Sequence, residues 1–130
     1  MIIKIPGNPI ALKRPRMSGK TVFDSQIKAK HGLKWVIKSQ WIHDPLNEPV
    51  ILDIVFHFSM PKSWSKKKRL EYLDKPHTNT PDLDNLVKWV CDLFNDIVFK
   101  DDRQVYKISA VKKYSEKGQT IVKILNAPTQ

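Results

Sequence analysis

An acidic segment in the second half of the chain carries the residues with the clearest potential for chemistry. It begins Pro-Asp-Leu-Asp-Asn-Leu-Val-Lys at residue 81 and ends Lys-Asp-Asp-Arg-Gln at residue 104. From residue 82 to 102, six aspartates stand against two lysines, a local charge of −4, although the whole chain carries +10. A basic surface attracts nucleic acid, and carboxylates within it would repel phosphate unless a hard divalent cation lay between them. This charge pattern predicts a metal-dependent nuclease.

Backbone geometry limits which of these carboxylates can act together. Side chains two residues apart diverge by about 200° in a helix but share one side of an extended segment. Because Pro81 favours an extended entry, we expect the helix to begin near Asp84 or Asn85, so that Asp82 and Asp84 form a carboxylate pair. Lys88 follows Asp84 by one helical turn, where it can steady that carboxylate or reach a phosphate oxygen.

The remaining aspartates are less well defined by their spacing. Asp101 and Asp102 are expected to face opposite sides at the start of a strand, so at most one joins the site, and spacing alone leaves open which one. Asp92 and Asp96 fit a solvated helix face. All of these acids also have purely structural interpretations, since aspartate favours helix starts and turns.

Basic residues gather in two segments that could hold backbone phosphates. The candidate DNA-binding residues are Lys13, Arg14, Arg16 and Lys20 in an early loop and Lys66, Lys67, Lys68 and Arg69 in a short helix. Trp64, just before the second segment, could stack on a base. The alternative is that the second segment is a solvated helix face that only keeps the protein in solution.

Composition restricts the class of protein. With 130 residues, 41% hydrophobic and 28% charged, we expect one globular domain spanning 1–130. No apolar run approaches the roughly 20 residues of a membrane span, and the N-terminus lacks a signal-peptide pattern. The single cysteine, Cys91, excludes an internal disulfide and fits a small core side chain. We therefore expect a cytoplasmic protein, without a membrane partner or a small-molecule cofactor.

Hydrophobic periodicity indicates an α+β domain with a mixed sheet and helices packed on one face. The expected helices cover residues 24 or 25 to 43, 66–73 with a cap at Ser63 or Ser65, and about 84–97. The expected strands cover 2–5, 50–60, 104–114 and 120–125, the last two joined as a hairpin around Gly118. Core residues of the central strand are Val50, Leu52, Ile54, Phe56 and Phe58, and the last helix should bury Leu83, Leu86, Val90, Leu93 and Ile97.

The acidic segment resembles the signature of the RusA family of Holliday junction resolvases from bacteria and their phages. The matching residues are Pro81-Asp82-Leu83-Asp84-Asn85, Lys88, Asp92 and Asp101-Asp102-Arg103-Gln104-Val105, with further similarity in Met60–Ser65, His77-Thr78 and Lys13–Arg16. The resemblance implies a RusA-like fold and a homodimer that uses Mg²⁺, with Mn²⁺ as a substitute. It also implies symmetric cutting of four-way DNA junctions in recombination and repair.

Carried over by position, the metal-binding and catalytic acids of that family fall on Asp82, Asp84 and Asp102, and its essential lysine falls on Lys88. Three carboxylates offer hard oxygen ligands that suit Mg²⁺. Of two rival classes, a non-catalytic basic DNA-binding or regulatory module would explain the charge of +10 but not the acidic segment, and a structural protein explains neither. The dimer interface is not located by the sequence, although Trp89 and Val98 are candidates.

Overall fold

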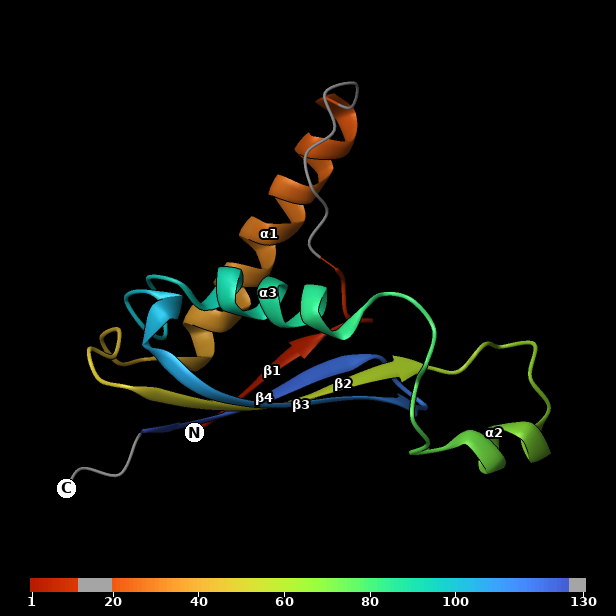
Figure 1. The fold of residues 1–130 in the computed structure, drawn as a ribbon. Coiled ribbons are helices and arrows are strands. Elements are labelled where there is room, and N and C mark those ends of the chain that lie inside the picture. The colour runs from red at the N-terminus through yellow and green to blue at the C-terminus, as the bar shows by residue number, and fades with distance from the viewer. Residues whose placement is uncertain (12–19, 127–130) are drawn as a thin grey trace.

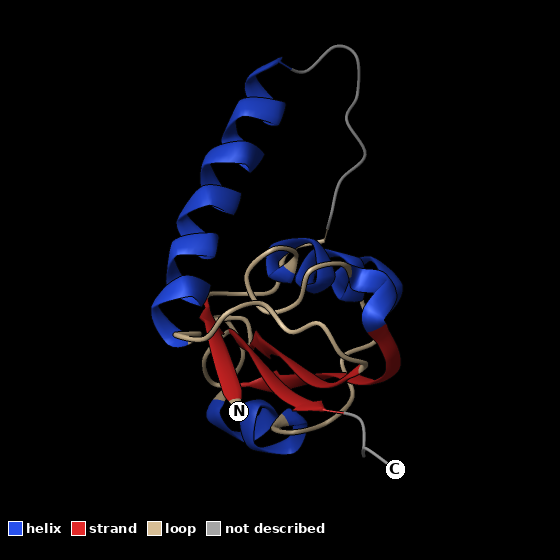
Figure 2. Ribbon diagram, turned by 90° about the vertical axis from the view of Figure 1, so that its left-hand side faces the viewer, coloured by secondary structure: helices blue, strands red, loops and turns tan. Residues whose placement is uncertain are grey.

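The sheet and its two long helices form the body of the molecule. A computed structural model describes residues 1–11 and 20–126, with 20–29 as main chain alone. The elements are β1 (Ile2–Pro6), α1 (Lys20–Gln40), β2 (Val50–Ser59), α2 (Lys66–Tyr72), α3 (Leu83–Phe94), the 3-10 helix η1 (Asp102–Gln104), β3 (Val105–Ser115) and β4 (Gln119–Asn126). Figure 1 and Figure 2 both show α1 and α3 on one side of the sheet, and Figure 1 shows α2 past its end. The predicted α+β class is confirmed.

β2 is a central strand of a four-stranded mixed sheet with the order β1-β4-β2-β3. Its alternate residues Val50, Leu52, Ile54, Phe56 and Phe58 are buried, as the period of two predicted. β2 runs parallel to β3 and antiparallel to β4, which also pairs antiparallel with β1. The predicted hairpin is therefore wrong, because β2 lies between β3 and β4. Placing the most apolar strand there satisfies its backbone groups on both sides.

The helices differ from their predicted bounds at several ends. α1 begins at Lys20 rather than near Asp24, since no proline or glycine interrupts residues 20–31, and it ends at Gln40. The Gln40 amide fixes that end by exchanging two 2.8 Å hydrogen bonds with the main chain of Lys4. α3 ends at Phe94 instead of near residue 97, because Asp96 has a positive φ of 67° and turns the chain.

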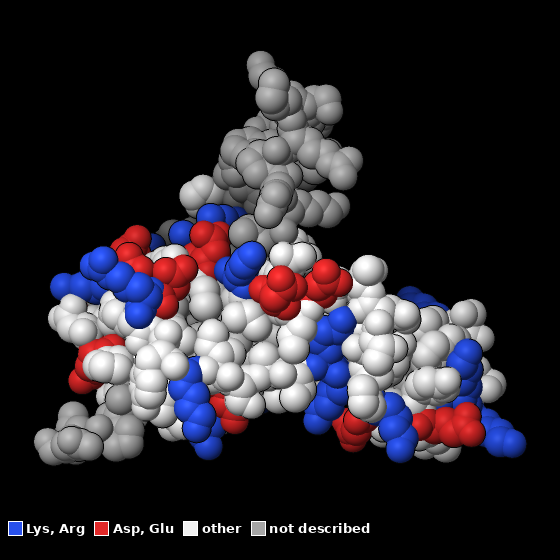
Figure 3. Space-filling model, in the orientation of Figure 1, with Lys and Arg blue, Asp and Glu red and all other residues white. Residues whose placement is uncertain are grey.

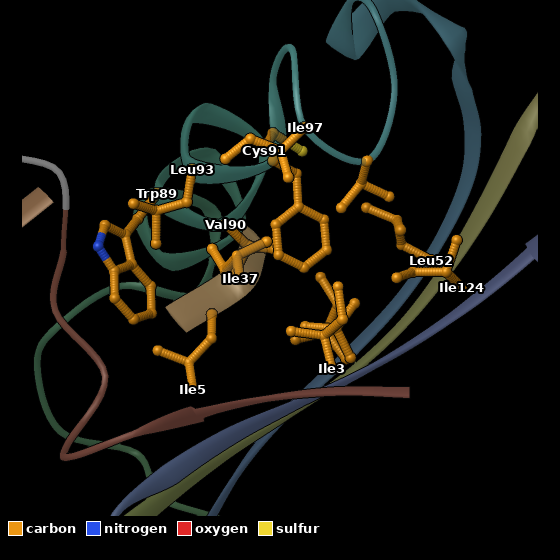
Figure 4. Packing of buried hydrophobic residues seen from close by; sticks show 14 of the residues in the cluster. Ile3, Ile5, Ile37, Leu52, Trp89, Val90, Cys91, Leu93, Ile97 and Ile124 are labelled. Atoms are coloured by element: carbon orange, nitrogen blue, oxygen red, sulfur yellow. The ribbon is translucent and has the colours of Figure 1, made fainter. Parts of the chain in front are cut away.

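The core lies between the helices and the sheet. Figure 4 shows Ile37 of α1 and Val90 and Leu93 of α3 above Ile3 of β1, with Leu52 of β2 to the right. The set of residues predicted for α3 is buried except for its first member, Leu83, which is 37% exposed at the helix start. Cys91 is buried, which confirms its predicted place in the core, and burial raises the pKa of its thiol to about 11. None of the helices in the described ranges is long and apolar enough to cross a bilayer.

Candidate active site

Asp82 and Asp84 lie at the N-terminal end of α3, on the side of the domain that carries the helices. Asp82 occupies the N-cap position with extended backbone (φ −68°, ψ 144°), and Asp84 belongs to the first helical turn. The helix thus begins one residue earlier than expected, and the two acids are not both on an extended segment. The Asp82 side chain accepts no capping hydrogen bond. Both residues are exposed, so their carboxylates are accessible to solvent at the helix start.

A lysine of β3 holds the loop that leads into Asp82. The Lys112 ammonium donates two 2.6 Å hydrogen bonds, one to the carbonyl oxygen of Asn79 and one to that of Pro81. The Asn79 amide in turn donates to the Tyr114 hydroxyl at 3.3 Å. Lys112 lies opposite buried Phe56 in the sheet register, an unusual place for a lysine. A lysine at a core-facing position of β3 was the sequence feature that could have indicated the role of Lys112, which was not among the predicted site residues.

The Asp101–Asp102 pair is arranged differently from the prediction. The residues start a 3-10 helix rather than a strand, so they do not face opposite sides of a sheet. Asp101 caps that helix: its carboxylate accepts from the Arg103 main-chain N–H at 3.0 Å, and the Asp101 main-chain N–H donates to the Gln104 side chain at 2.9 Å. Gln104 also donates to the Leu46 carbonyl at 2.8 Å, which ties η1 to the chain before β2. Asp101 therefore has a structural task.

Asp102 is the member of the pair that remains available for chemistry. A hydrogen bond with the Asp101 carboxylate, partial desolvation and the negative charge of Asp101 raise the pKa of Asp102. The hydrogen bond from the Arg103 main chain lowers the pKa of Asp101. The two neighbouring carboxylates therefore repel each other, and a cation bound at Asp102 would relieve that repulsion.

The structure places Asp102 at the opposite end of α3 from Asp82 and Asp84. Asp102 is close enough to Asp92 and Cys91 for their charges to interact. Asp92 follows Asp82 by ten residues, which corresponds to about 15 Å along a helix. Within the described part of the chain, no group of three His, Cys, Asp or Glu side chains could hold a metal ion together. One chain therefore does not assemble the three aspartates into a single site.

The other charged residues of α3 have distinct environments. Lys88 is exposed one turn beyond Asp84, and the ion pairs found among the described side chains do not involve it. Asp92, predicted to be solvated, instead pairs with Lys30 of α1 at 2.6 Å. Asp96 is not on the helix at all but in the turn that follows it. Lys88 is thus the cation of α3 that faces the same solvent region as Asp84.

The basic residues of α2 lie away from these acids. Ser65 caps α2 as predicted, accepting from the Lys68 N–H at 3.2 Å, and none of the residues of α2 is buried. The Lys68 ammonium nitrogen lies 4.4 Å from the centre of the Trp64 ring, and the rings of Trp64 and Tyr114 of β3 pack with 5.4 Å between their centres. Figure 3 shows acidic side chains in a band over α3, and several lysine and arginine side chains among uncharged and acidic ones over α2. The early-loop residues Lys13, Arg14 and Arg16, and the side chain of Lys20, lie outside the described residues.

Comparison with known proteins identifies the family. The profile described as Endodeoxyribonuclease RusA matches residues 6–125. The chain belongs to the RusA endodeoxyribonuclease family. A relative of similar length is the uncharacterized protein YqaN of Bacillus subtilis (strain 168), which is 37% identical over 128 residues. That alignment covers 91% of this chain and 90% of the relative. Membership in the RusA family implies endodeoxyribonuclease activity, which agrees with the acidic segment on a basic protein.

Proposed function

We propose that this protein is a divalent-metal-dependent endonuclease that resolves four-way DNA junctions by paired, symmetric cuts. One observation carries the proposal. In a chain of the RusA family, Asp82 and Asp84 expose two carboxylates at a helix start, where capping does not use Asp82 and Lys112 holds the preceding loop. Carboxylates presented on a braced backbone suit a hard cation and a phosphodiester better than a purely structural task.

The active form is a homodimer in which each site draws on both chains. Asp82 and Asp84 lie at one end of α3, and Asp102 lies near Asp92 toward the other end, which is about 15 Å along the helix from Asp82. A two-fold axis that sets two copies of α3 in opposite directions would bring the partner's Asp102 to Asp82 and Asp84. The dimer then has two equivalent sites, which matches the two cuts needed at a four-way junction.

The donor chemistry fits Mg²⁺, with Mn²⁺ as a substitute, because Asp82, Asp84 and Asp102 contribute only carboxylate oxygens. When bound, the ion would supply charge neutralisation at the phosphodiester and a water of lowered pKa. Lys88 lies one turn from Asp84 and places a positive charge where negative charge develops on the phosphate. Lys112 acts indirectly, since its two carbonyl contacts fix the backbone that leads into Asp82.

Binding of DNA is assigned to the basic residues outside α3. The exposed face of α2 offers Lys66, Lys67 and Lys68, and the early loop adds Lys13, Arg14, Arg16 and Lys20. Lysine and arginine contacts to phosphate position a duplex without reading its sequence. The expected setting is recombination and repair of DNA in the cytoplasm of a bacterial cell, where a phage genome could also encode the protein.

Cleavage of a synthetic four-way junction tests the function directly. We expect cutting with Mg²⁺ and none with EDTA, while binding persists in EDTA because lysine and arginine make the phosphate contacts. Asp82→Asn should abolish cutting and retain binding. Asp96→Asn is the matched control, since it removes an acid from the turn after the same helix. Binding without cutting under any divalent cation would instead support a non-catalytic DNA-binding module.

Selectivity is tested with a supercoiled plasmid that extrudes a cruciform. Paired cuts within one binding event give linear product directly, whereas independent nicking gives open circles first. Equal degradation of linear duplex would leave a metal-dependent nuclease but would contradict junction resolution.

A further inference from the structure

We propose that the homodimer forms through the open edge of β3, residues 107–111, which pairs antiparallel with the same edge of a second copy. The inference rests on the proposed function, because it names the surface that completes the shared site. It also replaces Trp89 and Val98, the interface candidates suggested by the sequence, since both are buried in the core of the single chain.

The two edges of the sheet are covered to different extents. On β1, the Gln40 amide bonds both main-chain groups of Lys4. On β3, the C-terminal part is covered by residues 74–77: His77 donates to the Lys112 carbonyl, and Tyr114 donates to the Lys75 carbonyl, each at 3.0 Å. No described segment pairs with the outer side of residues 107–111. Among the described residues, this stretch of β3 is therefore an edge segment whose outward hydrogen-bonding groups have no main-chain partner.

The direction of the open groups follows from strand alternation. Main-chain groups of every second residue point to the same side of a strand, and those of Lys112 and Tyr114 point outward. Ile108 and Ala110 therefore also point their N–H and C=O groups outward. A register irregularity opposite Val50 and Ile51 limits the regular edge on its N-terminal side. An open edge of this kind is a ready template for another strand.

An antiparallel pairing about a two-fold axis near Ser109 uses this whole stretch. Ile108 then lies opposite the partner's Ala110, and the two symmetric pairs exchange about four main-chain hydrogen bonds. Lys107 lies opposite the partner's Val111, so no lysine faces another lysine across the pair. Ile108 and Val111, which are 40% and 48% exposed, gain apolar cover on the two faces of the sheet. Figure 3 views the molecule from the β3 edge and shows largely uncharged surface below the acidic band.

The same symmetry completes the proposed catalytic site. A two-fold axis perpendicular to the sheet keeps the helices of both copies on one face and reverses the second β3. The partner's Asp102 begins its η1, the three-residue helix before its β3, and then lies at the end of the first copy's β3 that carries Lys112 and Tyr114. Those two residues hold the loop leading into Asp82. Pairing of the two β3 edges thus places the partner's Asp102 near the end of α3 that carries Asp82 and Asp84.

A cysteine placed on the axis tests the interface. Ser109 is exposed and would face its own copy as a non-hydrogen-bonded pair, with Cα atoms about 4.5 Å apart, within the range for a disulfide. We expect Ser109→Cys to form a cross-linked species of twice 15.1 kDa under mild oxidation. Asp53→Cys is the matched control, since Asp53 is exposed beside Ser109 on β2 but lies one strand away from the edge. Buried Cys91 should not cross-link in either protein.

A second variant changes the edge without adding a thiol. Ala110→Pro removes an outward N–H and leaves the ladder to β2 intact, so the variant should sediment as a folded monomer. A dimer that fails to cross-link through Ser109→Cys, or a wild-type protein that is monomeric at micromolar concentration, would overturn the proposed interface. A cross-linked dimer that cuts no branched DNA with any divalent cation would keep the interface and refute the proposed function.

Discussion

Mixing two inactive variants would reveal whether each active site draws on both subunits. Asp82→Asn damages the end of α3 that carries Asp84, and Asp102→Asn damages the acid near Asp92, which is about 15 Å along the helix from Asp82. In either pure variant both sites of a dimer lack one carboxylate. In a mixed dimer with shared sites, one site carries both substitutions and the other carries neither.

The size of the recovery follows from this geometry. Random exchange of equal amounts gives about half mixed dimers, each with one intact site of two, so about a quarter of the wild-type sites are restored. If the three aspartates acted within one chain, every site would be damaged and no activity would return. The expected product also changes, because a dimer with one intact site nicks a cruciform plasmid to open circles and makes little linear DNA directly.

The assay is single-turnover nicking after the two variants have been unfolded and refolded together, with differently tagged chains to confirm exchange. A mixture of Asp82→Asn with Asp84→Asn is the control, since both substitutions lie at the same end of α3 and no intact site can form. Confirmed mixed dimers of Asp82→Asn and Asp102→Asn that show no nicking would refute the shared site.

Three further predictions concern Lys112, the lysines of α2 and His77. Lys112→Ala should lower the cleavage rate about tenfold and raise the Mg²⁺ concentration for half-maximal rate, because hydrogen bonds from a charged group contribute about 1.5–3 kcal/mol. Lys112→Arg should restore part of the rate. Lys113→Ala is the control and should have little effect, since the 3.8 Å ion pair of Lys113 with Asp74 is exposed. Replacing Lys66, Lys67 and Lys68 by alanine should reduce the slope of log affinity against log salt by about 0.9 for each duplex phosphate that these lysines neutralise, and an unchanged slope would remove α2 from the DNA-binding surface. Burial lowers the pKa of His77, whose ring stacks on that of Phe58 with 4.0 Å between the ring centres. The contribution of His77 to folding stability is therefore present above about pH 6.5 and is lost as the pH falls through the lowered pKa. In urea unfolding between about pH 5 and 8, His77→Phe should reduce this loss of stability, while His57, whose pKa is also lowered, keeps part of the loss.

Local sequence patterns predicted the elements and much of the candidate site. Alternation along β2 identified its buried face, and Ser65 was one of two predicted caps for α2. Residue type and spacing along the chain were enough to select Asp82, Asp84 and Lys88 without knowledge of the fold, whereas the choice of Asp102 over Asp101 came from the resemblance to the RusA signature. These properties depend on neighbours within a few residues, which can be read directly from the order of the amino acids.

The arrangement of those elements depended on contacts between distant residues. The predicted hairpin failed because β2 takes the place between β3 and β4, a choice set by burial of the most apolar strand rather than by the turn at Gly118. The bracing of the 79–81 loop by Lys112 joins residues more than thirty positions apart, and no local pattern encodes it. The end of α3 at Phe94 likewise follows from the Asp96 turn and its contact with Phe99.

The order of amino acids was enough to define the chemistry of this protein: a basic chain, a carboxylate motif suited to a divalent cation, and an α+β domain of the RusA family. The location of that chemistry required the folded chain. Folding set Asp82 and Asp84 at one end of α3 and Asp102 at the other, gave Asp101 a capping task, and left one stretch of β3 open. The physical reason is that a helix of fixed rise separates residues that the motif groups together, and sheet order is decided by burial across the whole chain.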